Sequence, residues 1–206
     1  MSAPITIIDY GVGNIASIAN MLKKAGYASE LTGDPEVITR AEKLVLPGVG
    51  AFDRAAARLR EHGLRELVIE RATAGVQILG VCLGMQLLLD GSDEGTEPGL
   101  GIIPGRVRRF PHEVGGEMLR VPHMGWNTIR RIGHPEVLPD VNDGDRFYFV
   151  HSFYVDPADP ADTVATTTHG VPFTSIVTRG SVTGVQFHPE KSHKMGLRLL
   201  SDFARR

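Results

Sequence analysis

The single cysteine of the chain stands in a context that suits a nucleophile. Cys82 lies in the segment GVCLG at 80–84, between a buried apolar run and a helical pattern. A G-x-nucleophile-x-G segment at such a junction holds the nucleophile on a sharp turn above the sheet, close to a helix end that favours thiolate. The Leu83 amide is then a candidate oxyanion donor. A lone cysteine is more often a small buried apolar residue, but glycines on both sides favour the nucleophile.

A candidate base and its orienting acid lie more than a hundred residues further on, in the segment HPE at 188–190. Pro189 disfavours helix at His188, and residues two apart in extended backbone point to the same side. Glu190 could therefore accept a hydrogen bond from one imidazole nitrogen of His188 while the other nitrogen faces the thiol. Alone, His-x-Glu is commonly a surface pair, but together with GVCLG it indicates a catalytic triad.

A glycine-rich loop, PGVG at 47–50, directly follows the apolar segment KLVL. Such a loop could turn the Val49 amide toward a developing oxyanion, as a second donor. The alternative is an ordinary strand-to-helix turn that uses glycine for its positive φ. The loop alone does not decide between them.

The first ninety residues alternate between predicted strands and helices. A helix capped by Asn14 follows the first strand, and the glycine at 63 separates two later helices. Such alternation indicates an α/β fold with a mostly parallel central sheet and helices on both faces. The predicted strands are 5–9, 28–31, 43–46 and 76–81, and the predicted helices are 15–22, 52–61, 64–74 and 83–89.

Beyond residue 91 the chain is richer in strands and loops, which adds a region of antiparallel strands to this sheet. Its predicted strands are 106–110, 118–121, 146–150, 163–167, 174–177 and 183–187, with a final helix from about 194. No segment is long enough to be a linker, so one domain over 1–206 is expected. Arg106, Arg108 and Arg109 alternate along one short strand, which is typical of a solvated face.

Composition excludes several classes of protein. The 22 basic and 24 acidic residues nearly cancel, so no global field would attract nucleic acid or a membrane. The apolar stretch 75–89 is too short to span a bilayer, and the N-terminal segment lacks the pattern of a signal peptide, so a cytoplasmic location is expected. One cysteine and unsuitably spaced histidines predict no metal site, and no cofactor is expected.

Taken together, GVCLGMQ, HPE and PGVGAF resemble the class I, triad-type glutamine amidotransferases, whose fold is flavodoxin-like. DYGVGN at 9–14, VPHMGWN at 121–127 and YFVHS at 148–152 resemble, within that family, the glutaminase subunits of imidazole glycerol phosphate synthases. The resemblance implies that Cys82 attacks the carboxamide of L-glutamine to form a thioester, that His188 transfers protons and that Glu190 orients the imidazole. It also implies glutamine contacts at Gly50, Gln86, His151, Ser152 and Phe153, although tyrosine is common at the last position.

The resemblance further implies a heterodimer with a (β/α)₈-barrel cyclase that accepts the ammonia in histidine biosynthesis. No acceptor-binding domain is expected within this chain. The positions matching the family's cyclase-facing residues are Asn14, Met124, Trp126 and Lys191. Trp126 could instead be an ordinary core aromatic. Two other functions remain open: a glutaminase for another synthase, such as those for anthranilate or pyridoxal phosphate, and an idle scaffold. The segment PHMGWN disfavours the first, and the complete triad disfavours the second.

Overall fold

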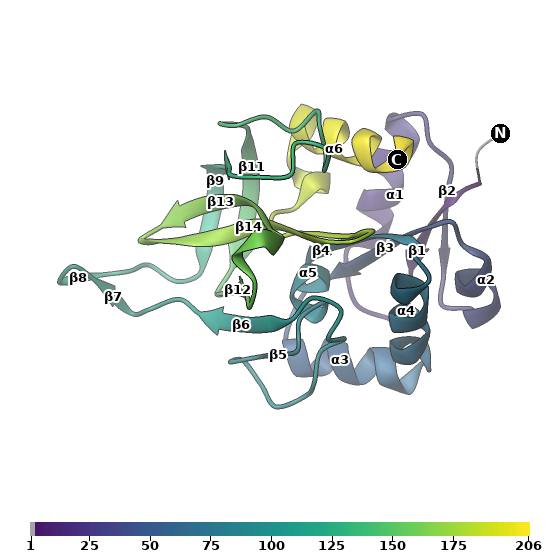
Figure 1. Cartoon of the computed structure of the whole chain (residues 1–206), viewed down its shortest axis with the longest axis horizontal. Helices are drawn as coiled ribbons and strands as arrows, with labels where there is room; N and C mark the ends of the chain where they lie inside the picture. Colours follow the sequence, from purple (N-terminus) through teal and green to yellow (C-terminus); the bar gives the residue numbers. More distant parts are fainter. Residues whose placement is uncertain (1–2) are drawn as a thin grey trace.

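A large mixed sheet runs through the computed structural model, which describes residues 3–206 (Figure 1). Its strand order is β2-β1-β3-β4-β15-β14-β12-β6-β5. The first five strands in this order pair in parallel, and both β4 and β15 end at the edge where Cys82 lies. These strands are β2 (Ser29–Thr32), β1 (Ile5–Ile8), β3 (Lys43–Gly48), β4 (Gln77–Cys82) and β15 (Val182–Val185).

Helices cover both faces of the parallel strands, and the apolar side chains alternate accordingly. Ile7 and Val45 lie in the core beneath α1 and α6, whereas Ile8 and Leu44 lie in the core beneath α3 and α4. Full burial of each such side chain contributes about 1.5–3 kcal/mol. One face carries α1 (Ile15–Lys24) and α6 (His193–Arg205), and the other α2 (Pro35–Arg40), α3 (Phe52–Glu61), α4 (Leu64–Thr73) and α5 (Leu83–Leu87).

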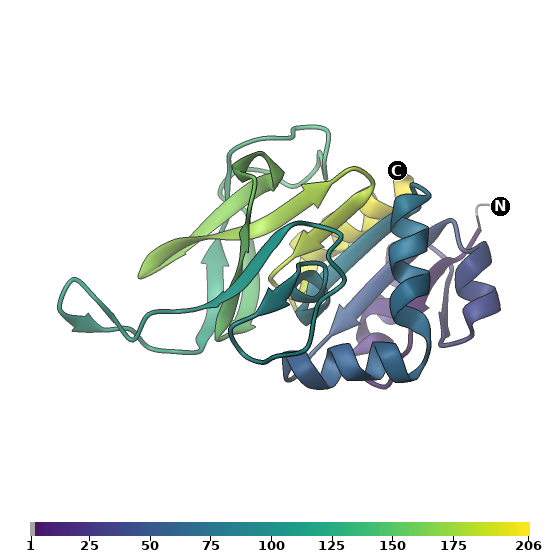
Figure 2. The same ribbon diagram turned by 60° about the horizontal axis from the view of Figure 1, so that its bottom comes forward.

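The rest of the sheet is mainly antiparallel, from β14 outward. A separate ribbon pairs β9 (His123–Thr128) with β11 (Arg146–His151). A small hairpin, β7 (Glu113–Val114) and β8 (Glu117–Met118), extends from the end of the molecule opposite α2 (Figures 1 and 2). The remaining elements are β5 (Gly91–Ser92), β6 (Gly105–Arg109), β10 (Arg130–Arg131), β12 (Phe153–Pro157), β13 (Thr163–His169), β14 (Val171–Arg179) and the short 3₁₀ turns η1 (Pro160–Asp162) and η2 (Pro189–Lys191).

The predicted fold class is confirmed, and several local predictions are wrong. Asn14 does not cap α1, because its backbone is not extended and its Oδ1 accepts a hydrogen bond from the Ser17 hydroxyl at 2.9 Å. The helix predicted over 83–89 ends at Leu87, and the strand predicted over 118–121 is reduced to β8. Strands β9 and β12 and helix α2 were not predicted.

Within residues 3–206, no helix is long and apolar enough to cross a membrane.

Candidate active site

Cys82 occupies a sharp turn between β4 and α5. Its φ of 55° and ψ of −110° are unusual for a residue with a side chain, and such strain concentrates at functional sites. The flanking glycines are required for close packing, since neither is among the residues with positive φ. A Cβ on Gly84 would lie 1.9 Å from the Leu46 carbonyl oxygen, and one on Gly80 would lie 2.9 Å from the Met85 nitrogen. The turn therefore needs small residues on both sides of the thiol.

His188 follows β15 and lies next to the thiol. Its Nδ1–H donates to Glu190 Oε1 at 2.8 Å, and both side chains are almost fully buried. Burial disfavours the charged imidazole, but hydrogen bonds with Cys82 and Glu190 outweigh this and raise the pKa of His188 to about 9. The Ser192 hydroxyl fixes this turn by donating to the His188 carbonyl at 2.6 Å and accepting from the Tyr148 amide at 3.0 Å. The base and the acid thus form a buried hydrogen-bonded pair beside the nucleophile.

A cavity of about 580 Å³ opens beside Cys82 and His188. It brings together both candidate oxyanion residues and all five candidate glutamine-binding residues, although these come from three separate parts of the chain. Asn14 and Lys191, expected at a partner interface, also line it, whereas Met124 and Trp126 do not. The lining residues are Asn14, Val49, Gly50, Cys82, Leu83, Gln86, Glu94, Pro122, Val150, His151, Ser152, Phe153, His188 and Lys191.

The PGVG loop borders the cavity. Gly50 has φ +98°, a conformation that glycine adopts readily, and the Val49 side chain is exposed. The buried Tyr10 hydroxyl donates to the Pro47 carbonyl at 2.6 Å and so anchors the start of the loop. Burial, with a smaller contribution from Cys82, raises the pKa of Tyr10 and keeps this donor protonated. The loop is fixed at its strand end and has open space at Gly50.

Two glutamine side chains connect the cavity wall to the thiol. Gln86 Nε2 donates to the Phe153 carbonyl at 3.0 Å and to Gln186 Oε1 at 3.2 Å. Gln186 Nε2 in turn lies 3.8 Å from Cys82 Sγ and donates to it. Gln186 was not predicted as a site residue, although its position two residues before His188 in a buried run was a usable signal.

Glu94 is another residue of the cavity that was not predicted. Its Oε2 accepts from the Phe52 amide at 2.9 Å, at the start of α3. It is the carboxylate among the lining residues. The sequence offered no signal for it, because it lies in a loop rich in acidic residues.

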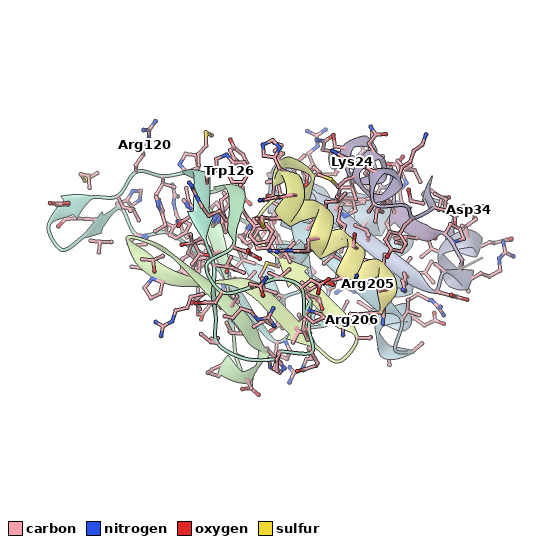
Figure 3. All side chains as sticks on the ribbon, turned by 90° about the horizontal axis from the view of Figure 1, so that it is seen from above. Lys24, Asp34, Arg120, Trp126, Arg205 and Arg206 are labelled. Carbon is pink, nitrogen blue, oxygen red and sulfur yellow. The ribbon has the colours of Figure 1, made fainter. Side chains whose placement is uncertain are left out.

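Met124 and Trp126 lie on the outer face of β9. Met124 is 62% exposed and Trp126 is 40% exposed, so Trp126 is not a core residue. The indole stacks on the His193 ring, with centroids 5.4 Å apart and planes 6° apart. Lys191 Nζ lies 5.8 Å from the ring centroid of Tyr148, which pairs with Trp126 across the ribbon. Trp126 and Lys24 lie along the same edge of the molecule (Figure 3).

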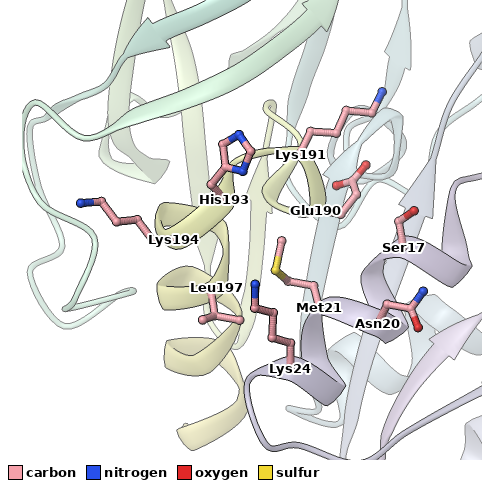
Figure 4. Close-up of a pocket in the computed structure, with 9 residues that line it drawn as sticks. All are labelled: Ser17, Asn20, Met21, Lys24, Glu190, Lys191, His193, Lys194 and Leu197. Carbon is pink, nitrogen blue, oxygen red and sulfur yellow. The ribbon is translucent and has the colours of Figure 1, made fainter.

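A second cavity, of about 450 Å³, lies between α1 and the start of α6 (Figure 4). Met21 and Lys24 of α1 face Leu197 of α6 across it, and Glu190 also lines it. Its other lining residues are Ser17, Asn20, Lys191, His193 and Lys194. The second cavity therefore reaches from Glu190 to His193, whose ring stacks on Trp126.

The arginines of β6 form a solvated face, as predicted. Arg106 pairs with Asp93 at 2.7 Å, and Arg108 with Asp156 at 3.3 Å.

Within residues 3–206, no group of three or more histidine, cysteine or acidic side chains is arranged to hold a metal ion.

Comparison with known sequences relates nearly the whole chain to one family. Residues 6–206 match the family described as glutamine amidotransferase class-I. A protein of Syntrophotalea carbinolica named imidazole glycerol phosphate synthase subunit HisH is 46% identical over 202 residues, which cover 97% of this chain and 98% of that protein. Its Pseudomonas aeruginosa counterpart, subunit HisH 2, is 47% identical over 201 residues, with 97% and 98% covered. The Geobacter sulfurreducens subunit is 45% identical over 202 residues, with 97% of each covered.

Solved structures share the fold at much lower identity. A crystal structure described as a glutamine amidotransferase superposes with a TM-score of 0.75 at 20% identity, covering 98% of this chain and all of the other. The PurLQS structure from Thermotoga maritima also gives 0.75, at 17% identity, with 100% and 99% covered.

Proposed function

Because the chain is a member of the class I glutamine amidotransferase family, we propose that it is the glutaminase subunit of an imidazole glycerol phosphate synthase. It hydrolyses L-glutamine to glutamate and ammonia. The ammonia passes to a cyclase subunit that makes imidazole glycerol phosphate and aminoimidazole carboxamide ribotide in histidine biosynthesis. The observation that carries the proposal is the buried group of Cys82, His188 and Glu190 beside a cavity large enough for glutamine.

The reaction proceeds through a thioester. Cys82 Sγ attacks the side-chain carbonyl carbon of glutamine, and the imidazolium of His188 gives its proton to the leaving nitrogen as the carbon–nitrogen bond breaks. Water then attacks the thioester, His188 takes a proton from it, and the carbon–sulfur bond breaks to release glutamate. Glu190 keeps the imidazole oriented and stabilises its positive charge. The amides of Leu83 and Val49 stabilise the negative oxygen of each tetrahedral intermediate.

Substrate recognition is assigned to the cavity wall. Both Nε2 hydrogens of Gln86 are already donated, so its Oε1 is the atom left to accept from the substrate. The Glu94 carboxylate suits the α-ammonium group of glutamine. The backbone of Gly50 and of residues 151–153 completes the contacts with the substrate.

The ammonia acceptor is assigned to a second chain, a (β/α)₈-barrel cyclase in a heterodimer. Ammonia released into neutral water is mostly protonated and loses its nucleophilicity, so direct transfer is required. The exposed Met124 and Trp126 suit an apolar docking contact, and Asn14 and Lys191 line the glutamine cavity. We assign residues 1–206 to a single cytoplasmic domain that needs no cofactor.

The test compares glutamine-dependent and ammonia-dependent synthesis by the complex. Cys82→Ser is expected to abolish the first and retain the second, and a glutamine-derived electrophile is expected to label Cys82. Glutamine-dependent turnover that survives in this variant would exclude the thioester mechanism. In a parallel assay, glutamine hydrolysis by the isolated chain should be slow and should rise with the cyclase and its nucleotide ligand. Full activity of the isolated chain would exclude this coupling.

A further inference from the structure

Two buried histidines of the β9–β11 ribbon, His123 and His151, form a hydrogen-bonded line that ends at the wall of the glutamine cavity. Asn127 Nδ2 lies 3.2 Å from His123 Nε2, and His123 Nδ1 lies 3.0 Å from His151 Nε2. His151 Nδ1 lies 2.8 Å from the Phe153 carbonyl oxygen. That oxygen is the one to which Gln86 also donates. The line thus connects β9 with the side chain that faces the substrate.

The Phe153 end of the line fixes the direction of each hydrogen bond. A carbonyl oxygen only accepts, so His151 Nδ1 carries a hydrogen. In a neutral ring His151 Nε2 is then an acceptor, and His123 Nδ1 must donate to it. His123 Nε2 is left without a hydrogen and accepts from Asn127.

The Asn127 end independently requires the same direction. Its Oδ1 accepts from the Thr128 amide at 2.8 Å, and its Nδ2 donates to the Thr168 carbonyl at 2.9 Å. These two backbone contacts fix the amide with its nitrogen toward His123. A protonated His123 would direct an N–H at this NH₂ group, which has no lone pair to accept it.

The surroundings keep both rings neutral. Phe110, Phe149 and Phe173 pack around them, with ring centroids 5.1–5.8 Å from that of His151. Burial, with smaller contributions from neighbouring histidines, lowers the pKa of His123 to about 4 and that of His151 to about 3. The titratable group that affects His123 is His169, those that affect His151 are His123, His169 and His188, and no carboxylate is among these.

We propose that His123 is a positioning residue for glutamine hydrolysis, acting through His151 and the Phe153 carbonyl on Gln86. This inference rests on the proposed function. His123 forces His151 to present an N–H to the Phe153 oxygen, because the other tautomer would direct a lone pair at it. The fixed oxygen holds one Nε2 hydrogen of Gln86, and Gln186 holds the other. Gln86 Oε1 is therefore kept toward the substrate, and Gln186 is kept donating to the thiol.

The experiment pairs two substitutions in the assembled synthase. His123→Phe retains an aromatic ring but removes the N–H, whereas His123→Asn places an amide N–H near the position of Nδ1. We expect His123→Phe to lower kcat/KM for glutamine about tenfold, the cost of losing one buried hydrogen bond. His123→Asn should restore most of this loss, and ammonia-dependent synthesis should be unchanged in both. Wild-type kcat/KM in His123→Phe, or equal losses in both variants, would overturn the proposal.

A spectroscopic measurement on the wild-type chain tests the line without any substitution. Nitrogen-15 NMR of the imidazoles should show His123 and His151 both neutral and both carrying hydrogen on Nδ1 at pH 7. A charged ring or an Nε2–H tautomer at either residue would overturn the proposal. This readout also separates the two failures: a wild-type synthase that releases no ammonia from glutamine would refute the proposed function, while the tautomers would still decide the positioning role.

Discussion

The tripeptide His-Pro-Glu occurs twice in this chain, at 134–136 and at 188–190, and the two copies have opposite surroundings. In both, histidine Nδ1 contacts a glutamate Oε1, at 3.2 Å in the first copy and 2.8 Å in the second. The side chains are 36% and 67% exposed in the first copy but 3% and 2% exposed in the second. The same local sequence thus makes a surface pair in one place and part of a catalytic group in the other.

The two copies also differ in what raises the pKa of the histidine. For His134 the main cause is a hydrogen bond to the Ala161 carbonyl, followed by one with Glu136. For His188 the hydrogen bonds with Cys82 and Glu190 must overcome burial. His123 and His151 show the result of burial without a carboxylate, since their pKa values fall to about 4 and about 3. Burial alone therefore keeps a histidine neutral, and the interactions with Cys82 and then with the buried acid Glu190 keep His188 charged despite its burial.

The largest expected effect comes from removing that buried acid. Glu190→Gln should lower kcat/KM for glutamine by roughly 10²- to 10⁴-fold, as in other triads that lose the acid. The alkaline limb of the pH profile, expected near pH 9 from the pKa of His188, should move to lower pH. The sign follows because the lost negative charge had stabilised the imidazolium. An unchanged alkaline limb would show that Glu190 does not control His188.

Placing a carboxylate beside the neutral pair of His123 and His151 should raise the pKa of His123, as Glu190 helps to raise that of His188. In Asn127→Asp the new charge faces His123 Nε2, so the pKa of His123 should rise from about 4. A hydrogen on His123 Nε2 reverses the direction of the hydrogen bonds along the line from residue 127 to Phe153. As a result, kcat/KM for glutamine should fall about tenfold at pH 7. NMR titration of the imidazole and steady-state kinetics measure the two effects. A raised pKa with unchanged kinetics would separate the histidine pair from the glutamine site.

A smaller effect is expected on acid stability. Because the pKa of His123 is lower in the folded chain than its ordinary 6.5, the unfolded chain binds more protons between these values. The free energy of unfolding should therefore fall as the pH falls from 6.5 toward 4, by up to about 1.4 kcal/mol per pH unit for this residue. In urea titrations at several pH values, His123→Phe should show a shallower decline than the wild type. Parallel declines would contradict a neutral, buried His123.

The smallest effect is expected at the exposed copy of the tripeptide. Glu136→Gln makes the same chemical change as Glu190→Gln, but solvent screens the pair that it removes. Glutamine hydrolysis should be unchanged, and the melting temperature should stay within about 2 °C of the wild type. This variant is the matched control for Glu190→Gln. A large loss of activity in it would imply that the His-Pro-Glu sequence itself, rather than its burial, matters.

The parts of the site that the sequence predicted are those where a reactive side chain and the residues that shape its backbone stand next to each other in the chain. The glycines around Cys82 and the proline after His188 constrain the backbone within a few residues, so a short motif carries the information. Glu94 could not be assigned in this way, because it acts through a contact with Phe52, which is distant in the chain. Strand β9 was missed for a similar reason. Its pairing with β11, rather than its own residues, makes it a strand.

The sequence by itself determined the alternation of strands and helices, the turn at Cys82 and the pairing of His188 with Glu190. These depend on backbone preferences and on spacing along the chain. The tertiary structure decided that the copy at 188–190 is buried while the copy at 134–136 is exposed, and which hydrogen bonds orient Gln86. The copy at 188–190 follows β15, which pairs directly with β4 and so ends beside Cys82. The copy at 134–136 lies in a loop after β10, where both side chains are exposed to solvent instead of being buried beside a sheet.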